Sequence, residues 1–170
     1  DAVRYRGNGP SAAAKYGAVA VIVRSVTGAY DDFPHTGSLR YNDTLPKIPA
    51  VAISTVGADK LSGYIKGSYK DENFFIRTNC EMLPDTIGHN VIGEIRGSEF
   101  PDEIITIGGH LDSWDPGEGA SDDGTGIVQS IEILRAFKAI GYKPKRTIRI
   151  VLFANEENGL RGGNKYAEEA

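Results

Sequence analysis

Apolar residues in the last third of the chain alternate between strand-like and helix-like patterns. Residues 103–109 (EIITIGG) and 146–154 (RTIRIVLFA) are short apolar runs rich in β-branched residues, which predicts two strands. Between them, Ile127 and Ile131 recur at helical spacing within residues 123–140. Strand, helix and strand in this order predict a βαβ unit, whose strands are parallel and joined by a right-handed crossover.

Polar residues and glycines mark the ends of this helix, and a further helix follows. Asp122 or Asp123 can cap the start of the first helix, and Gly141 followed by Pro144 can end it. Residues 159–170 (GLRGGNKYAEEA) predict another helix that continues to the last residue.

The first part of the chain predicts a smaller set of elements. Residues 9–17 (GPSAAAKYG) are typical of a short helix that Ser11 caps and Gly17 ends. Residues 18–26 (AVAVIVRSV) predict a buried strand. Residues 28–47 carry glycines, prolines and scattered polar residues, which indicates a long excursion.

Four more segments lead from this excursion to the βαβ unit. Residues 48–54 (IPAVAIS) predict a strand, and residues 55–67 (TVGADKLSGYIKG) predict a short amphipathic helix. Residues 73–82 (NFFIRTNCEM) and 89–97 (HNVIGEIRG) predict strands that the turn-prone residues 83–88 (LPDTIG) connect.

The change of pattern between Gly67 and Asn73 predicts a domain boundary. The first series of strands and helices ends at Gly67, and a new apolar run begins at Asn73. A chain of 170 residues is long enough for two small domains. We therefore expect an α/β chain with one domain in residues 1–70 and a second in residues 71–170.

Charge and composition narrow the classes of partner. The net charge of −4 is spread over the chain without a basic stripe, which argues against nucleic acid as a partner. No apolar run reaches the roughly 20 residues that cross a bilayer, so no membrane span is expected. The single cysteine, Cys80, excludes an internal disulfide and is expected to be a buried small hydrophobic residue.

Charged side chains gather where the predicted parallel strands end. The carboxyl ends of parallel strands meet at one edge of a sheet, which is where open α/β sheets bind ligands. Six groups follow these ends or precede the helix: His110, Asp112, Asp122, Asp123, Glu156 and Glu157. Carboxylates this close raise one another's pKa values, and a divalent cation would offset their repulsion. An imidazole with carboxylates suits Zn²⁺, and bridging carboxylates suit two ions about 3.5–4 Å apart.

Spacing separates the roles of these groups. His110 and Asp112 are two residues apart in an extended segment, so both point the same way and Asp112 can accept the second imidazole N–H. Glu156 and Glu157 are adjacent, so one can hold metal while the other acts as a general base toward a metal-bound water. Each group alone also has a structural interpretation, because Asp-Asp before a helix is commonly a cap and Glu-Glu is commonly solvated.

Three ordered stretches resemble a known family. They are GGHLDSW, GASDDGTG and PKRTIRIVLFANEENGLRGG, and they are similar to the co-catalytic zinc aminopeptidases, in particular the carboxypeptidase Q (plasma glutamate carboxypeptidase) branch. The earlier stretches VRYRGNGPSAAAKYGAVAVIVRSV, PHTG and PKIPAVAIS resemble the protease-associated domain of that branch. The resemblance implies a partial protease-associated β/α domain, followed by the first half of a zinc-exopeptidase α/β/α sandwich with a mixed sheet.

The family pattern implies a role for each matching residue. His110 would bind one zinc, Asp112 would orient that histidine, and Asp122 would bridge both zincs. Glu156 would be the general base, and Glu157 would bind the other zinc. In that family a water between two zincs attacks the scissile carbonyl, so aminopeptidase or dipeptidase action on small peptides is implied. Secreted, periplasmic or lysosomal placement is also implied.

The family completes its site with ligands that this chain does not contain. A further Asp and a further His lie well downstream of the Glu-Glu pair in family members, and this chain ends thirteen residues after Glu157. The chain is therefore expected to be a piece of a longer protein, with poor zinc affinity and no useful turnover by itself. An unfinished sheet also exposes an edge, which favours association into a homo-oligomer.

Two other functions remain open from the sequence. A non-catalytic member of the fold would use its accessory domain for binding, although such a protein has no need to keep His110, Asp122 and both glutamates. A zinc acyltransferase of the glutaminyl cyclase type shares the sheet, although the accompanying accessory domain argues against it.

Overall fold

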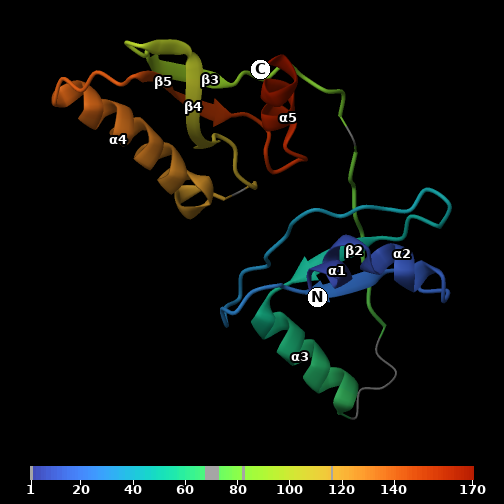
Figure 1. Cartoon of the computed structure of the whole chain (residues 1–170). Coiled ribbons are helices and arrows are strands. Elements are labelled where there is room, and N and C mark those ends of the chain that lie inside the picture. The colour runs from blue at the N-terminus through green and yellow to red at the C-terminus, as the bar shows by residue number, and fades with distance from the viewer. Residues whose placement is uncertain (1, 68–72, 82, 116) are drawn as a thin grey trace. The chain divides into compact units, whose positions relative to one another are not determined.

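The chain forms two compact units in a computed structural model (Figure 1). The structure describes residues 2–67, 73–81, 83–115 and 117–170. The units are Asp1–Leu83 and Pro84–Ala170. The boundary that we predicted near residue 70 falls on residues 68–72, which lie outside the described residues. Within the described ranges, no helix combines the length and the hydrophobicity needed to cross a membrane.

The first unit combines helices with a pair of parallel strands. Its elements are α1 (Val3–Gly7), α2 (Gly9–Ala14), β1 (Val21–Arg24), β2 (Ala50–Ile53) and α3 (Thr55–Lys66). The two strands pair in register from Val21 and Ala50 to Arg24 and Ile53. The two strands and the longer helix that the sequence predicts for this unit are therefore confirmed, although β1 is half-buried rather than buried.

The start of the first unit differs from the prediction. The helical region is broken at Asn8 into α1 and α2, and the second helix ends at Ala14. Ser11 does not cap a helix, because it lies buried inside α2 and its hydroxyl accepts a hydrogen bond from the N–H of Asn42 at 2.9 Å. A polar residue near the start of a helix here accepts a hydrogen bond from the backbone of a distant loop. The local sequence cannot predict such a contact.

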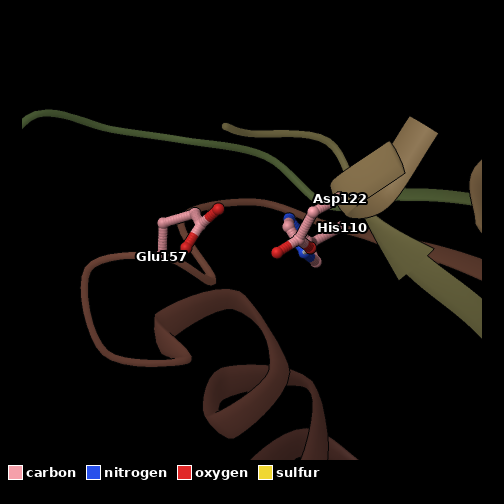
Figure 2. A group of neighbouring side chains, drawn as sticks. All are labelled: His110, Asp122 and Glu157. Atoms are coloured by element: carbon pink, nitrogen blue, oxygen red, sulfur yellow. Dashed lines mark hydrogen bonds and ion pairs between the residues drawn. The ribbon is translucent and has the colours of Figure 1, made fainter. Parts of the chain in front are cut away.

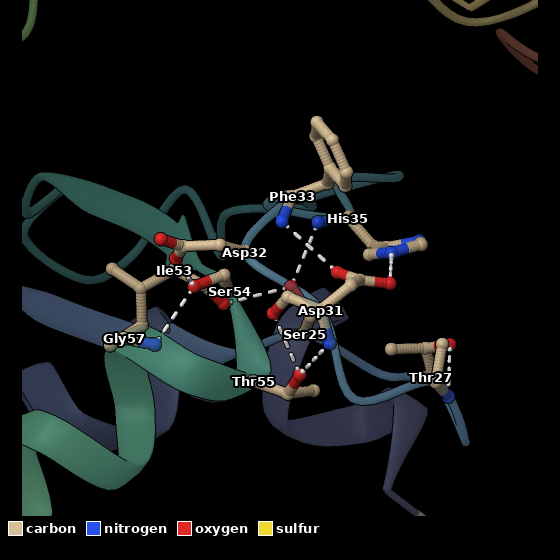
Figure 3. A network of polar contacts seen from close by, with 11 residues as sticks. Ser25, Thr27, Asp31, Asp32, Phe33, His35, Ile53, Ser54, Thr55 and Gly57 are labelled. Atoms are coloured by element: carbon tan, nitrogen blue, oxygen red, sulfur yellow. Dashed lines mark hydrogen bonds and ion pairs between the residues drawn. The ribbon is translucent and has the colours of Figure 1, made fainter.

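The excursion over residues 28–47 contains no helix or strand, and hydrogen bonds attach it to the start of α3 (Figure 3). The Thr55 hydroxyl donates to the carbonyl of Asp31 at 3.0 Å and accepts the Asp31 N–H at 2.9 Å. Ser54, the N-cap of α3, donates to the Asp32 carboxylate at 2.6 Å. The excursion is thus an anchored loop.

The second unit is built on a mixed sheet with the strand order β3-β5-β4. Its elements are β3 (Val91–Ile95), β4 (Phe100–His110), the turn η1 (Ala120–Gly124), α4 (Thr125–Ala139), β5 (Arg146–Phe153) and α5 (Arg161–Glu169). The central strand β5 runs parallel to β4 and antiparallel to β3. Helix α4 packs against β4 and β5 (Figure 1). The predicted βαβ unit with parallel strands is confirmed.

The core of the second unit lies on its central strand. Ile150, Val151 and Leu152 are buried, and adjacent strand residues point to opposite faces, so both faces of the sheet are covered at β5. By contrast, Ile104 and Ile105 of β4 are 43% and 50% exposed. The strand that carries the core also ends at the candidate site, which gives the site a rigid base.

The segment before β3 does not form the predicted strand. Residues 73–81 are in neither a helix nor a strand, and residue 82 lies outside the described residues. Cys80 is exposed, so its expected burial is also wrong. The reason is that an apolar run becomes a strand only where a neighbour pairs with it and covers one of its faces. Phe75, which is 88% exposed, has no such cover here.

Candidate metal centre

The ends of β4 and β5 bring the predicted groups to one edge of the sheet. His110 is the last residue of β4, and it pairs with Phe153, the last residue of β5. Glu156 and Glu157 lie in the loop that follows β5. The parallel register of the two strands therefore places His110 beside the start of the loop that carries both glutamates, as the βαβ prediction requires.

His110 is held through its ring nitrogen Nδ1. The side chain is only 11% exposed, and Nδ1 lies 2.8 Å from the carbonyl oxygen of Asp112. The Asp112 carboxylate lies farther away, with Oδ1 at 3.7 Å from Nδ1. The predicted contact between these two residues is therefore made by the backbone in this structure. A carbonyl can only accept a hydrogen bond, so Nδ1 carries a proton, and in the neutral ring Nε2 then offers its lone pair.

The Asp112 carboxylate instead holds the glutamate loop. Its two oxygens accept the N–H groups of Glu156 and Glu157 at 2.9 and 3.1 Å. Burial raises the pKa of Asp112. The hydrogen bonds from these backbone N–H groups and the nearby His110 lower this pKa by a larger amount, so the pKa of Asp112 lies below its usual value. Asp112 thus stays ionised and joins the His110 segment to the Glu156–Glu157 segment.

Three side chains from different segments point their ligand atoms at one place. Nε2 of His110 lies 2.9 Å from Oδ1 of Asp122, and the ligand atoms of His110, Asp122 and Glu157 all lie within 4.8 Å of one another. In Figure 2, Glu157 extends from the loop after β5, while His110 and Asp122 lie together beside the end of β4. Oε2 of Glu156 is 3.8 Å from Nε2 of His110.

The electrostatics of the group favour a cation. Burial lowers the pKa of His110, but the Asp112 carbonyl and the carboxylates of Asp122 and Glu156 raise it to a net value above normal. Burial and the charge of Asp122 raise the pKa of Glu157, and His110 offsets only part of this. One imidazole and several carboxylates form a donor set that fits a divalent ion such as Zn²⁺.

Asp123 contacts the start of α4, as one of the two predicted capping candidates, and it also contacts His110, which the sequence did not predict. Its carboxylate accepts the N–H of His110 at 3.1 Å and the N–H of Gly126, in the first turn of α4, at 3.2 Å. The backbone angles of Asp122 and Asp123 are not helical, so α4 begins at Thr125 rather than at residue 123. A side chain at Gly109 would collide with the Asp123 carboxylate, so this glycine is the sequence signal for the contact.

The sequence of the second unit matches a family model. Residues 90–170 match the model of "Peptidase family M28". Over these residues, the chain belongs to peptidase family M28. The matched range contains β3, the whole mixed sheet and all six of the charged groups that the sequence places at its edge.

Relatives of this M28 chain match nearly its whole length. The chain is 42% identical to carboxypeptidase Q of Xenopus laevis over 168 residues, which is 99% of this chain and 36% of that protein. The crystal structure of the Peptidase M28 precursor from Shewanella amazonensis SB2B has a TM-score of 0.83 and 40% identity, covering 98% of this chain and 38% of that one. An aminopeptidase from Aneurinibacillus sp. strain AM-1 has a TM-score of 0.58 and 27% identity, covering 95% and 38%.

These matches have two consequences. The mixed α/β architecture of this M28 chain is that of solved M28 peptidases. The chain spans little more than a third of the length of the relatives it matches.

Proposed function

We propose that the chain is part of a zinc-dependent exopeptidase that hydrolyses small peptides. The single observation that carries this proposal is the contact between His110 Nε2 and Asp122 Oδ1 at 2.9 Å, with Glu157 nearby. Because Nδ1 donates to the Asp112 carbonyl, the lone pairs of Nε2 and of the carboxylate face each other. A proton or a metal ion must lie between them. The relatives named carboxypeptidase and aminopeptidase support the choice of reaction.

Each residue of the site has its own proposed role in metal binding or in proton transfer. His110, Asp122 and Glu157 would hold zinc, and a complete site would hold two ions. When bound, zinc supplies Lewis-acid polarisation of the scissile carbonyl and acidifies the attacking water. Glu156 would accept a proton from the attacking water and deliver it to the leaving amine. Asp112 positions Glu156 and Glu157 through their backbone N–H groups.

The remaining parts of the proposal concern the whole protein. The first unit is proposed to be a protease-associated domain. Two features support this proposal: the parallel pair of strands, and the sequence stretches that resemble such a domain. Extracytoplasmic placement is proposed from the likeness to carboxypeptidase Q. Fractionation of cells that express the full-length protein tests this, and an exclusively cytosolic protein would contradict it.

The decisive test of the reaction is Glu156→Gln in the full-length protein. We expect kcat on aminoacyl dipeptides to fall about 10²–10⁴-fold, which is the usual contribution of a general base, while the zinc content stays unchanged. Glu168→Gln makes the same change on an exposed residue of α5 and should keep full activity. If the Glu156→Gln variant keeps its turnover, Glu156 is not the general base. Turnover of N-terminal glutaminyl peptides instead of dipeptides would indicate a cyclase.

A further inference from the structure

The loop that carries Glu156 and Glu157 is closed by the side chain of the residue before β3. Asn90, directly before β3, accepts the N–H of Ala154 at Oδ1 and donates from Nδ2 to the carbonyl of Gly162, both at 2.9 Å. The N–H of Gly162 also donates to the carbonyl of Ala154 at 2.9 Å. One carboxamide therefore joins the two ends of the loop.

The sheet register explains why this residue makes the contact. β3 pairs antiparallel with β5, and the last paired residues at this end are Val91 and Leu152. Asn90 lies one residue beyond, where its side chain continues the pairing that the two backbones no longer make. A carboxamide presents one acceptor and one donor in a plane, which matches the N–H of Ala154 and the carbonyl of Gly162. A carboxylate would only accept.

Gly162 is the matching half of this contact. A Cβ at residue 162 would lie 2.7 Å from the Ala154 nitrogen and would collide with the Ala154 carbonyl and with Asn90 Oδ1. A Cβ at the neighbouring Gly163 would meet nothing within 4 Å. The missing side chain at residue 162 is therefore required by the contact, whereas the one at residue 163 is not.

The same loop is held at its middle by a second residue. Asp112 accepts the N–H groups of Glu156 and Glu157, as described above. The loop between Ala154 and Gly162 is thus fixed at both ends by Asn90 and in between by Asp112. The backbone of either glutamate therefore cannot move away from Asp112 without breaking a part-buried hydrogen bond.

We propose that Asn90, with Gly162, is a positioning residue that sets where Glu156 and Glu157 lie for metal binding and proton transfer. We call the contacts among Asn90, Ala154 and Gly162 the Asn90 clasp. The expected effect of the Asn90 clasp on metal affinity and on turnover rests on the proposed function. The expected effect of the clasp on the mobility of the loop does not. Residues that position metal ligands through hydrogen bonds, without touching the metal, typically change the metal affinity when they are substituted.

Two substitutions open the clasp, and each has a matched control. Asn90→Asp keeps the shape of the side chain and removes the donor, and its control is Asn79→Asp at an exposed position. Gly162→Ala inserts the colliding Cβ, and its control is Gly163→Ala in the same helix turn. Far-UV circular dichroism establishes that each variant folds. If one of the two clasp variants does not fold, the other decides.

The measurements are made on the full-length protein. Hydrogen exchange of the metal-free protein should be faster over residues 154–162 in both clasp variants and unchanged in both controls. Zinc affinity, measured by competition with a chelator, should fall about 10–100-fold in the clasp variants. In the zinc-loaded enzyme, kcat should fall more than KM changes, since the displaced groups act in the chemical step.

The outcomes separate this proposal from the proposed function. Unchanged exchange in both folded variants would overturn the clasp, and faster exchange with unchanged zinc affinity would overturn its role at the metal. A wild-type protein that binds zinc but cleaves no peptide would contradict the exopeptidase instead. In that case, a loss of zinc affinity in the clasp variants would still support the role of Asn90.

Discussion

At the scale of single residues, Asp123 shows how one carboxylate links two elements. It accepts one N–H from His110 at the end of β4 and one from Gly126 in α4. Asp123→Asn replaces one of the two acceptor oxygens with a donor, which leaves a part-buried N–H without a partner. We expect the free energy of unfolding to fall by about 1–3 kcal/mol, measured by urea denaturation of the metal-free protein.

The matched control for this prediction is Asp102→Asn on β4. Asp102 is exposed, so the same change of charge should alter the free energy of unfolding only slightly. An equal loss of stability in both variants would mean that charge, rather than the two hydrogen bonds of Asp123, causes the effect.

The contacts of single atoms lie beyond what a pattern predicts. The two-residue spacing of His110 and Asp112 correctly predicted that they lie close together, but not that the carbonyl rather than the carboxylate meets Nδ1. The carboxylate is used elsewhere, because the N–H groups of Glu156 and Glu157 come within its reach. Only the folded chain brings these donors there.

At the scale of elements, the start of α3 depends on a short network around Ser54. The Ser54 hydroxyl accepts the N–H of Gly57 at 2.8 Å and donates to Asp32 at 2.6 Å. Ser54→Ala removes the N-cap and releases this part of the excursion. We expect a loss of about 1 kcal/mol in the stability of the first unit, measured by circular dichroism during urea unfolding.

Ser62→Ala provides the comparison for the cap. Ser62 lies inside α3, where alanine is the better helix former, so this variant should be as stable as the wild type or slightly more stable. A Ser54→Ala variant as stable as Ser62→Ala would mean that Ser54 does not stabilise the helix.

The predictability of an element follows from how local its causes are. β4, α4 and β5 were predicted because each has an apolar pattern of the right period, and the helix also has end signals at the Asp122–Asp123 pair and at Gly141. The strand predicted at residues 73–82 is wrong over residues 73–81, because none of the described strands pairs with them. Pairing depends on distant residues, which no local pattern contains.

At the scale of the whole molecule, zinc binding tests how much of the site this chain holds. Three ligand atoms converge here, whereas a complete site of two ions needs more. We expect the 170-residue chain to hold less than one zinc after dialysis and to show no useful turnover. The full-length protein should hold two. Elemental analysis that finds two tightly held zincs in the short chain would contradict this, or would indicate that another chain completes the site.

Association between chains is the second prediction at this scale. Among the described strands, β4 pairs only with β5, and Ile104 and Ile105 of β4 are exposed. Such an edge favours strand pairing, so the apparent mass of the 170-residue chain in light scattering should rise with concentration. Ile105→Lys should reduce this rise, because a charged edge residue opposes pairing. Ile140→Lys, away from the strand, should not, and an equal effect of both would indicate general hydrophobic aggregation.

The sequence by itself determined the strand–helix–strand order and the edge at which His110, Asp122 and Glu157 meet. Both follow from local periodicity and from the direction of parallel strands. Only the tertiary structure decided which atoms meet. In the folded chain, the Asp112 carboxylate accepts hydrogen bonds from the loop with the two glutamates, and the Asp123 carboxylate accepts one from His110. The Asn90 side chain forms hydrogen bonds with Ala154 and Gly162. These contacts join residues far apart in the chain, and their geometry is decided by packing rather than by any pattern along the sequence.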